Sequence, residues 1–344
     1  MQYREFGKTG VKVSRLGFGA MRLPTSDPDQ AVELLREGIK RGINYLDTAL
    51  YYLDGQSEVF VGRAIKGQRD KVIVSTKNPI EDASGANWRK RLEASLSKLD
   101  TDYIDFYHMW AISWDKYTQM IDVPGGPMEE ARKAKEEGLI RHISFSFHDT
   151  PENLIKLIDT GNFETMLVQY NLLDRSNEEG INYAKEKGLG VAVMGPVGGG
   201  RLGAPSEEIR RLIPTGTKSS AEMALRFVLS NPSVDVALSG MSNLEMLEEN
   251  ICIASLEEPL STREKNMLAD ILEEKKRLAE LYCTGCGYCM PCPNGVDIPV
   301  NFTYMNYDRV YGLIDAAKNG YKGLKEKGKA AESCVLSVPR KLRL

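Results

Sequence analysis

An α/β fold, a (β/α)8 TIM barrel followed by a small C-terminal helical module, is what the 344-residue sequence predicts. Three observations lead to this prediction. A short apolar run alternates with an amphipathic helical pattern eight times, the alternation spans roughly 250 residues, and the pattern changes after about Leu260. A doubly wound sheet usually has fewer strands, and it would have Gly-x-Gly-x-x-Gly before its first helix. Residues 17–22 read Gly-Phe-Gly-Ala-Met-Arg, so we prefer the barrel.

The eight predicted strands are short runs rich in β-branched and aromatic residues. They span Val13–Phe18, Tyr45–Thr48, Lys71–Thr76, Tyr103–Tyr107, His142–Ser146, Thr165–Gln169, Gly190–Met194 and Val234–Leu238. The eight predicted helices have apolar residues at helical spacing. They span Gln30–Arg41, Ser57–Lys66, Ala86–Leu99, Pro127–Glu137, Pro151–Thr160, Glu178–Lys187, Ser220–Leu229 and Leu244–Ala254. We therefore place the barrel domain at residues 1–260.

A second domain is expected over residues 261–344. Thr262–Glu280 is a charged helical stretch, a run of cysteines follows it, and Val300–Lys318 has helical potential. The segment has little apolar core of its own. Small modules of this kind usually need a metal or a cluster in order to fold.

The composition is that of an ordinary globular protein and excludes several classes. Apolar residues make up 42%, charged residues 27%, and the net charge is -3. Interspersed Lys and Arg give no footprint for nucleic acid, and no apolar run approaches the length of about 18 residues that a membrane span needs. Residues 1–5 start no signal-peptide pattern, so we expect a cytoplasmic protein with neither nucleic acid nor membrane as partner.

Three polar side chains are expected at the C-terminal ends of neighbouring strands, where such a barrel places its active site. Asp47 ends the second strand, Tyr52 follows in the next loop, and Lys77 ends the third strand. Asp47 and Lys77 can form an ion pair because their strands are adjacent. A phenol titrates at about pH 10, but a neighbouring ammonium favours the phenolate. The three residues are typical of a general acid that protonates a carbonyl oxygen while hydride arrives at the carbon.

The segment Asp47-Thr48-Ala49-Leu50-Tyr51-Tyr52, with Ser57-Glu58 soon after it, resembles the Asp-Thr-Ala-x-x-Tyr signature of the aldo-keto reductase superfamily. Thr76-Lys77 resembles the strand-three lysine of that family. Further similar segments are Val168–Leu173, Gly195–Leu202, Ser239–Asn243 and Leu247–Asn250. The resemblance implies a barrel that binds NADP or NAD and reduces a small aldehyde or ketone, or oxidises the alcohol, with an Asp, Tyr, Lys, His tetrad.

The resemblance also implies which residues hold the nicotinamide cofactor. Ser146 and Gln169 match its carboxamide ligands, and other residues match the contacts to the ring, the pyrophosphate and the adenosine. These are Met194, Gly195, Pro196, Val197, Gly200, Gly240, Ser242 and Asn250. Glycines let backbone N–H groups approach phosphate oxygens, and a helix beginning near Asn243 offers its positive N-terminus. The basic residues that many members use for the 2′-phosphate are absent here, where Gly240 and Met246 stand near those positions, so the choice between NADP and NAD stays open.

The tetrad histidine of the family is replaced in this sequence. The corresponding position, three residues after Tyr107, holds Trp110. His108 lies two residues earlier on the same face of the strand and therefore one layer deeper in the barrel. We assign the fourth catalytic position to His108, which is equally consistent with a hydrogen-bonded core residue. His148, at the end of the fifth strand, is the alternative group over the carbonyl.

The C-terminal cysteines have the spacing of an iron–sulfur site. Cys283, Cys286, Cys289 and Cys292 form a C-x2-C-x2-C-x2-C-P run. Bacterial ferredoxins use the similar C-x2-C-x2-C-x3-C-P spacing for [4Fe–4S] clusters. A structural zinc site would have two C-x2-C pairs separated by about a dozen residues, so the run favours a cluster over zinc.

This tail resembles the ferredoxin-like extension of an iron–sulfur subgroup of aldo-keto reductases, in which a second cysteine motif follows. Here Cys334 alone stands where that motif would begin. Five thiolates complete one four-ligand site and cannot complete two. We expect one [4Fe–4S] cluster held by Cys283, Cys286, Cys289 and either Cys292 or Cys334.

Two further hypotheses follow from these departures. Hydride transfer moves two electrons and needs no iron–sulfur centre, so the cluster is either structural or a one-electron port to a redox protein partner. In the second case the chain would be an electron-transfer protein. Trp110 in place of the tetrad histidine also leaves a non-catalytic, cofactor-binding regulatory barrel open. Cys252, in the eighth helix, is expected to be a small buried residue.

Overall fold

The computed structural model describes residues 1–172, 174–197, 219–268, 270, 291–309 and 312–332. The chain divides into two compact units. The first comprises Met1–Gly198 and Ala224–Pro259, and the second comprises Gly199–Met223 and Leu260–Leu344. The barrel strands and the four predicted catalytic residues all belong to the first unit.

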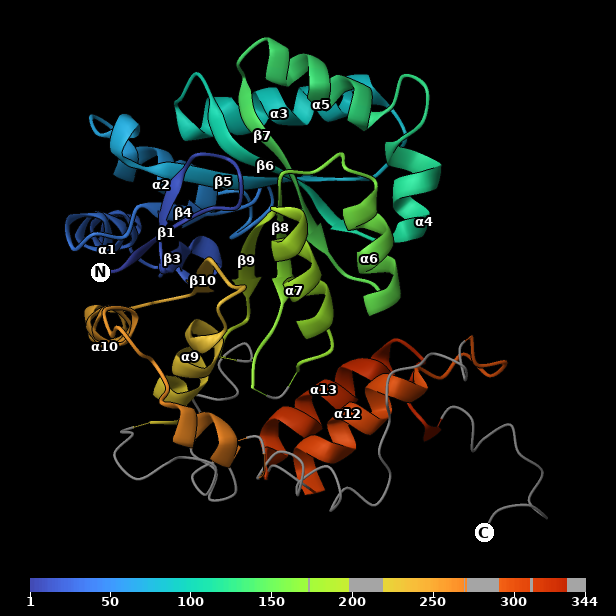
Figure 1. Ribbon diagram of the computed structural model, residues 1–344. Helices are drawn as coiled ribbons and strands as arrows, with labels where there is room; N and C mark the ends of the chain where they lie inside the picture. Colours follow the sequence, from blue (N-terminus) through green and yellow to red (C-terminus); the bar gives the residue numbers. More distant parts are fainter. Residues whose placement is uncertain (173, 198–218, 269, 271–290, 310–311, 333–344) are drawn as a thin grey trace. The chain divides into compact units, whose positions relative to one another are not determined.

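Eight parallel strands close into a barrel in the order β10-β3-β4-β5-β6-β7-β8-β9 (Figure 1). They are β3 (Leu16–Gly19), β4 (Tyr45–Asp47), β5 (Ile73–Pro79), β6 (Ile104–Ile112), β7 (Ile140–Phe147), β8 (Thr165–Gln169), β9 (Gly190–Met194) and β10 (Val236–Ser239). Because the strands run parallel, their C-terminal ends meet at one end of the barrel. The predicted (β/α)8 barrel is confirmed.

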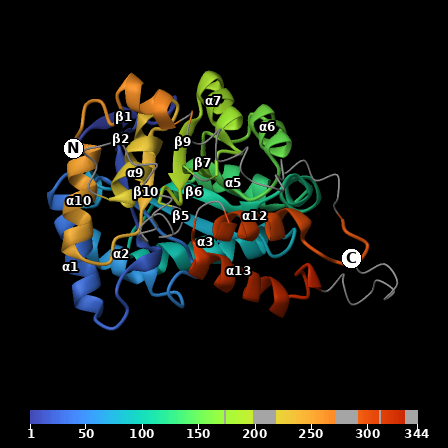
Figure 2. The same cartoon turned by 90° about the horizontal axis from the view of Figure 1, so that it is seen from below.

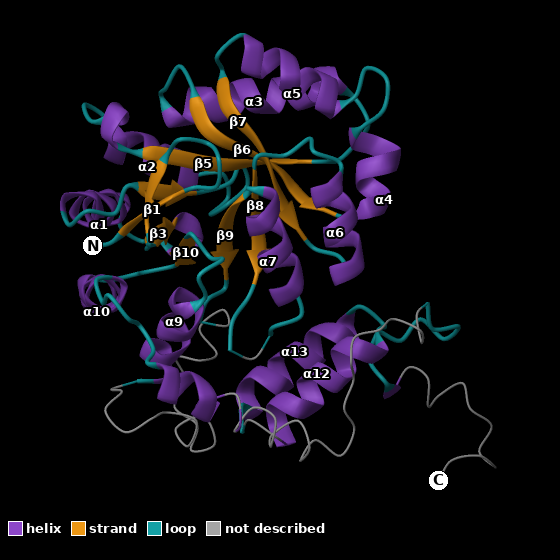
Figure 3. Cartoon of the chain, in the orientation of Figure 1, coloured by secondary structure: helices purple, strands orange, loops and turns teal. Residues whose placement is uncertain are grey.

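Amphipathic helices connect the strands and cover the barrel (Figure 3). They include α1 (Pro28–Lys40), α2 (Ser57–Ile65), α3 (Gly85–Leu99), α5 (Pro127–Glu136), α6 (Pro151–Asp159), α7 (Glu178–Lys187), α9 (Ser220–Ser230) and α10 (Leu244–Ala254). Local chemistry sets their ends. Asp27 caps α1 by accepting from the backbone of Asp29 and Gln30, and Gly188 ends α7 with a φ of +90°. Within the described ranges, no helix is both long and apolar enough to cross a membrane.

The first predicted strand, Val13–Phe18, is wrong as a single strand. Lys12–Ser14 (β2) pairs antiparallel with Tyr3–Glu5 (β1), whereas Leu16–Gly19 belongs to the barrel. Both pieces are buried, so the apolar run in the sequence hides the break at Arg15.

The hairpin of β1 and β2 fills the N-terminal end of the barrel. Phe6, in its turn, is fully buried and packs edge-on against Tyr45 and Phe106, with ring centroids 5.6 and 4.9 Å away. Apolar side chains from β8, β9 and β10 join this cluster. The chemistry is therefore left to the other end of the barrel.

Two predicted strands, Lys71–Thr76 and Tyr103–Tyr107, end too early. β5 runs to Pro79 and β6 to Ile112, because Lys77 pairs with His108 and Pro79 pairs with Trp110. Lys77 and His108 therefore lie within strands and not at their ends. The other predicted boundaries of barrel strands and helices agree with the structure to within two residues.

In the second unit, α12 (Ile298–Arg309) and α13 (Ile314–Glu326) lie side by side (Figures 1 and 2). The helical potential expected over Val300–Lys318 is confirmed as parts of two helices, and Gly312 between them has a φ of +61°. Residues 262–268 are helical, in agreement with the start of the predicted helix Thr262–Glu280. Residues 269 and 271–280 of that helix lie outside the described residues.

Gly62 brings α2 close to the end of α3. A Cβ atom at this position would lie 2.5 Å from the carbonyl oxygen of Leu99. Because that neighbour is backbone, we expect Gly62→Ala to lower the free energy of unfolding by about 1–3 kcal/mol, measured by urea denaturation. Arg63→Ala is the control, since its exposed ion pair with Asp29 is worth less than about 1 kcal/mol. An unchanged midpoint for Gly62→Ala would contradict the close approach.

Candidate active site

A buried ion pair joins β4 to β5 near the C-terminal end of the barrel. Lys77 and Asp47 are 1% and 4% exposed, and the Lys77 ammonium donates a hydrogen bond to the Asp47 carboxylate. The same ammonium donates to the carbonyl oxygen of Thr48 at 2.6 Å. Asp47 lies opposite Ser75 in the sheet register, so the long side chain of Lys77 reaches back by one inward-facing position. The ion pair expected from the adjacent strands is present.

Burial and charge compete at this pair. Burial lowers the pKa of the Lys77 ammonium, but the charges of Asp47 and Tyr52 and its hydrogen bonds to them outweigh burial and raise that pKa above its ordinary value. Burial raises the pKa of the Asp47 carboxyl, against the charge of Lys77. Lys77 is therefore a buried ammonium at neutral pH.

Tyr52 lies in the loop after β4, next to this ammonium. The Lys77 Nζ atom is 4.8 Å from the centroid of the Tyr52 ring. Trp110 packs edge-on against the Tyr52 ring, with centroids 5.5 Å apart. Tyr52 is half-buried, so one phenol faces both the buried charge and the opening of the barrel.

The first turn of α2 holds the loop in place. The Ser57 hydroxyl donates to the carbonyl of Ala20 at 2.9 Å, so at 2.7 Å it accepts from the hydroxyl of Thr48. The Ser57 backbone N–H donates to the carbonyl of Tyr52 at 3.2 Å. Glu58 accepts from Thr76, the neighbour of Lys77, at 2.7 Å. Ser57-Glu58 therefore fixes both the backbone of Tyr52 and the Thr48 carbonyl that receives Lys77.

His108 lies fully buried beneath the ion pair. Its Nε2 atom is 2.8 Å from the hydroxyl of Ser75, and Ser75 in turn donates to Asp47 at 2.9 Å. Burial, followed by the charge of Lys77, lowers the pKa of His108 to about 3. The imidazole is therefore neutral, and it is connected to Asp47 through the hydroxyl of Ser75. Reasoning from the sequence missed Ser75, although its spacing of two from Lys77 puts both side chains on one face of β5.

His148 follows β7 and is exposed at the mouth of the barrel. Partial burial and then the charges of Lys116 and Lys77 lower its pKa, so this imidazole is also neutral at neutral pH. His148 is thus the histidine on the open side, and His108 is the one on the buried side.

Ser146 lies at the end of β7 next to a strained bulge in β6. The backbone N–H of Ala111 donates to the Ser146 hydroxyl at 2.8 Å. Ala111 has a φ of +52°, in the left-handed region that non-glycine residues avoid, where the register between Met109 and Ile112 shifts. The Ser146 hydroxyl accepts this hydrogen bond, so its own proton can be donated to another acceptor.

Gln169 and Gly195 lie together at the ends of β8 and β9. Gly195 has a φ of +63°, and a Cβ atom there would be 2.6 Å from the Gln169 Oε1 atom. Glycine is therefore required at this position. Met194 beside it is half-buried, Pro196 is buried, and Val197 ends the described part of this loop.

The N-terminus of α10 follows β10. Asn243 caps the helix by accepting from the backbone of Met246 at 2.9 Å, and Asn250 donates to Ser239 at 3.0 Å. Gly240 and the exposed Ser242 precede the helix. The helix that the sequence predicts near Asn243 is present. Gly200, another predicted cofactor residue, lies outside the described residues.

Comparisons with known proteins agree with this geometry. The model of the aldo/keto reductase family matches residues 15–273. The chain belongs to the aldo/keto reductase family. It is 30% identical to the uncharacterized oxidoreductase YqkF of Bacillus subtilis over 74% of this chain and 92% of the relative.

Solved aldo/keto reductases have the same fold. The holo form of AKR11C1 from Bacillus halodurans is 32% identical, with a TM-score of 0.71 over 79% of this chain and 96% of that one. An aldo/keto reductase from Klebsiella pneumoniae, solved with NADP and acetate, is 28% identical, with a TM-score of 0.66 over 77% and 93%. Membership of this family makes the chain an aldo/keto reductase-type oxidoreductase.

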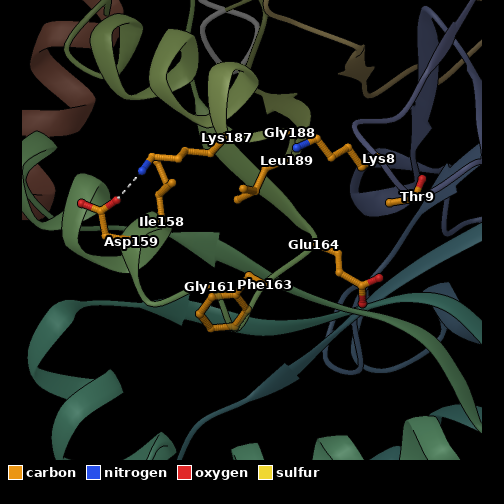
Figure 4. A pocket seen from close by; sticks show the side chains of 10 residues that line it. All are labelled: Lys8, Thr9, Ile158, Asp159, Gly161, Phe163, Glu164, Lys187, Gly188 and Leu189. Atoms are coloured by element: carbon orange, nitrogen blue, oxygen red, sulfur yellow. Dashed lines mark ion pairs between the residues drawn. The ribbon is translucent and has the colours of Figure 1, made fainter.

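A surface cavity of about 490 Å³ lies away from this aldo/keto reductase site. Figure 4 shows its lining, which includes Lys8, Asp159, Glu164, Lys187 and Leu189. These residues belong to the C-terminal ends of α6 and α7, to the loops that lead from them into β8 and β9, and to the turn of the N-terminal hairpin. The cavity therefore lies at the N-terminal ends of the strands, and none of the predicted site residues lines it.

The cysteines of the predicted cluster fall mostly outside the description. Cys283, Cys286, Cys289 and Cys334 lie outside the described residues, and Cys292 is half-buried and forms no disulfide with a described residue. Among the residues that the structure describes, no group of three or more His, Cys, Asp or Glu could hold a metal ion. Cys252 is exposed, so the expectation of a buried residue is wrong: it faces away from the side of α10 that buries Ile253.

Removing one partner of the ion pair leaves the other charge buried alone. We expect Lys77→Met to lower the free energy of unfolding by about 3–5 kcal/mol, measured by urea denaturation. The double variant Asp47→Asn/Lys77→Met has neither charge and should recover at least half of that loss. Equal losses in the single and the double variant would contradict a buried charge pair.

Proposed function

We propose that the chain is an NADPH- or NADH-dependent reductase of a small aldehyde or ketone, or a dehydrogenase of the corresponding alcohol. The observation that carries the proposal is the buried ammonium of Lys77, held by Asp47 and facing the ring of Tyr52 at the mouth of the barrel. The Asp-Thr-Ala-x-x-Tyr segment and family membership support the same chemistry.

Tyr52 would act as the general acid. A reduced nicotinamide bound at the strand ends would supply the hydride for the carbonyl carbon. Tyr52 gives its hydroxyl proton to the carbonyl oxygen, so that the C=O bond becomes the C–O bond of an alcohol. The ammonium of Lys77 stabilises the tyrosinate that remains, and Asp47 compensates the buried charge of Lys77. His148, exposed on the open side, would orient the carbonyl in place of the histidine that Trp110 replaces. His108, to which the sequence assigns the fourth catalytic position, is fully buried beneath the ion pair and would act through Ser75 and Asp47.

The cofactor site would combine several of the residues at the strand ends. Ser146 keeps its hydroxyl proton for the carboxamide oxygen of a nicotinamide, because its acceptor capacity serves Ala111. Gln169 beneath Gly195 would complete the carboxamide site, with Met194, Pro196, Val197 and Gly200 along the ring and pyrophosphate. Gly240, Ser242 and Asn250 would position α10 for the adenosine end.

Both NADP and NAD stay candidates for this site. The Klebsiella pneumoniae relative solved with NADP supports the first. The first turn of α10 carries Glu245 as its charged residue, which repels a 2′-phosphate and supports the second. The rates with NADPH and NADH decide between them.

The role of Tyr52 can be tested by removing its hydroxyl alone. We expect Tyr52→Phe to lower kcat for aldehyde reduction by about 10²–10⁴-fold, because proton delivery is lost. Binding of NADPH and NADH, measured by fluorescence titration, should change little. Tyr51→Phe is the matched control, since that hydroxyl donates to Glu81 at 3.0 Å on the exposed rim. Full activity of Tyr52→Phe would refute the assignment.

We further propose that residues 1–260 form the reductase domain and that residues 261–344 form a ferredoxin-like module of the iron–sulfur subgroup. The cysteine spacing carries this proposal, with one [4Fe–4S] cluster held by Cys283, Cys286, Cys289 and either Cys292 or Cys334. Reduced thiols of this kind are typical of the cytoplasm, where we place the protein. The cluster would be structural, or would exchange single electrons with a redox protein partner.

Metal analysis tests the cluster directly. Anaerobically purified protein should contain about four iron and four sulfide per chain. Cys286→Ala should lose both, whereas Cys252→Ala, outside the motif, should keep them. Of Cys292→Ala and Cys334→Ala, the one that loses iron identifies the fourth ligand. Stoichiometric zinc, or about eight iron per chain, would contradict a single cluster.

A further inference from the structure

Ser75 connects two buried polar side chains that come from different strands. It lies on β5 one inward-facing position below Lys77, directly opposite Asp47 on β4 and Phe106 on β6. Its hydroxyl is 2.9 Å from Asp47 Oδ2 and 2.8 Å from His108 Nε2. Ser75 and His108 are both 0% exposed. The three groups therefore form a chain that has no contact with bulk water at Ser75 or His108.

The number of protons available fixes the direction of both hydrogen bonds. A serine hydroxyl has one proton to donate, and an ionised carboxylate accepts only. Ser75 must therefore donate to Asp47, so its oxygen accepts from His108. A neutral imidazole that donates through Nε2 carries its proton there and has a bare Nδ1 atom.

We propose that Ser75 is a positioning residue that connects the Nε2–H tautomer of His108 to Asp47 and so keeps the carboxylate ionised and oriented for Lys77. The inference rests on the proposed function only for its effect on turnover. One carboxylate oxygen, Oδ2, is occupied by Ser75, which leaves Oδ1 for Lys77. The Lys77–Asp47 pair then has a single arrangement, in which the ammonium of Lys77 faces Tyr52.

The groups that face this chain are few in the described part of the barrel. Burial raises the pKa of Asp47, while Lys77 and Ser75 of β5 lower it. The charge of Asp47 adds to burial in raising the pKa of Tyr45 on β4. Burial and then the charge of Lys77 lower the pKa of His108, whereas the backbone of Phe145 on β7 raises it. The Nδ1 atom of His108 has no hydrogen-bond partner among the described residues. Lys77 stays charged and His108 stays neutral at neutral pH, so Asp47 is the member whose protonation would break the arrangement.

Removing the Ser75 donor should make Asp47 easier to protonate. Without Ser75 the anion loses a hydrogen bond, so the pKa of Asp47 rises and the ion pair fails at a higher pH. We expect Ser75→Ala to move the acid limb of the pH profile of kcat upward by about one unit, which corresponds to ~1.4 kcal/mol. Ser75→Thr, which keeps a hydroxyl, should restore most of the wild-type limb. The midpoint of the ¹³C-carboxyl titration of Asp47 should move with the limb.

Ser144→Ala is the matched control for a lost buried hydroxyl. Ser144 lies in the same barrel on β7, is 0% exposed, and bonds to Thr165 at 2.6 Å. Its loss should leave the acid limb of kcat and the Asp47 titration in place. At His108, Gln offers an N–H donor near the Nε2 position and Leu offers none. His108→Gln should therefore keep more of the wild-type profile than His108→Leu.

The tautomer is measured without substrate or activity. The chain has three histidines, so a long-range ¹H–¹⁵N spectrum resolves His108, assigned by its absence in His108→Gln. We expect the neutral Nε2–H form at neutral pH, changed by Ser75→Ala and unchanged by Ser144→Ala. An Nδ1–H form donating to the Phe145 backbone, or an Asp47 titration that ignores Ser75→Ala, would overturn the proposal. A wild-type protein that reduced no carbonyl would count against the proposed function instead and leave these two readouts standing.

Discussion

The buried ion pair between Lys77 and Asp47 is the interaction on which the rest of the site depends. The attraction between two buried charges is roughly cancelled by the free energy that both groups lose on leaving water. A buried ion pair is therefore stable only when the remaining donors and acceptors of both groups also form hydrogen bonds. Thr48 accepts from the ammonium, and Ser75 donates to the carboxylate. Thr48 is bonded in turn to Ser57 in the first turn of α2, whose backbone N–H donates to the carbonyl of Tyr52, and Ser75 is bonded to His108 of β6.

Because His108 and His148 are both neutral, the Lys77–Asp47 pair is the dominant charge next to Tyr52. A protonated histidine beside Lys77 would repel it and weaken its effect on Tyr52. His108 avoids this by burial, with a pKa of about 3, and the pKa of His148 is lowered as well. Trp110 has no titratable group, and it packs against Tyr52 where the family has a histidine. The proton that the proposed reaction needs is then left to Tyr52 and Lys77.

Much of this site could be predicted from the sequence because it depends on position along single strands. The order of strands and the Asp-Thr-Ala-x-x-Tyr segment were enough to bring Asp47, Lys77 and Tyr52 together, and the period of two placed His108 one layer below Trp110. The Ser75 connection and the strained Ala111 could not be predicted. The first needs the register between β5 and β6, and the second is a bulge set by how β6 meets β7. The hairpin of β1 and β2 was missed for a related reason, since burial in two different sheets looks like one apolar run.

The ferredoxin-like module proposed for residues 261–344 would have a role other than proton delivery. All the described partners of Asp47, Tyr52 and Lys77 lie in the unit of Met1–Gly198 and Ala224–Pro259. A proton donor, the cation that stabilises its anion and the carboxylate that balances the cation are therefore complete within that unit. Hydride transfer also moves its two electrons together, whereas a cluster passes them singly. The cluster proposed for residues 261–344 is thus left with two physical roles, which are to supply folding free energy that a small apolar core lacks, or to exchange electrons with a partner outside the hydride reaction.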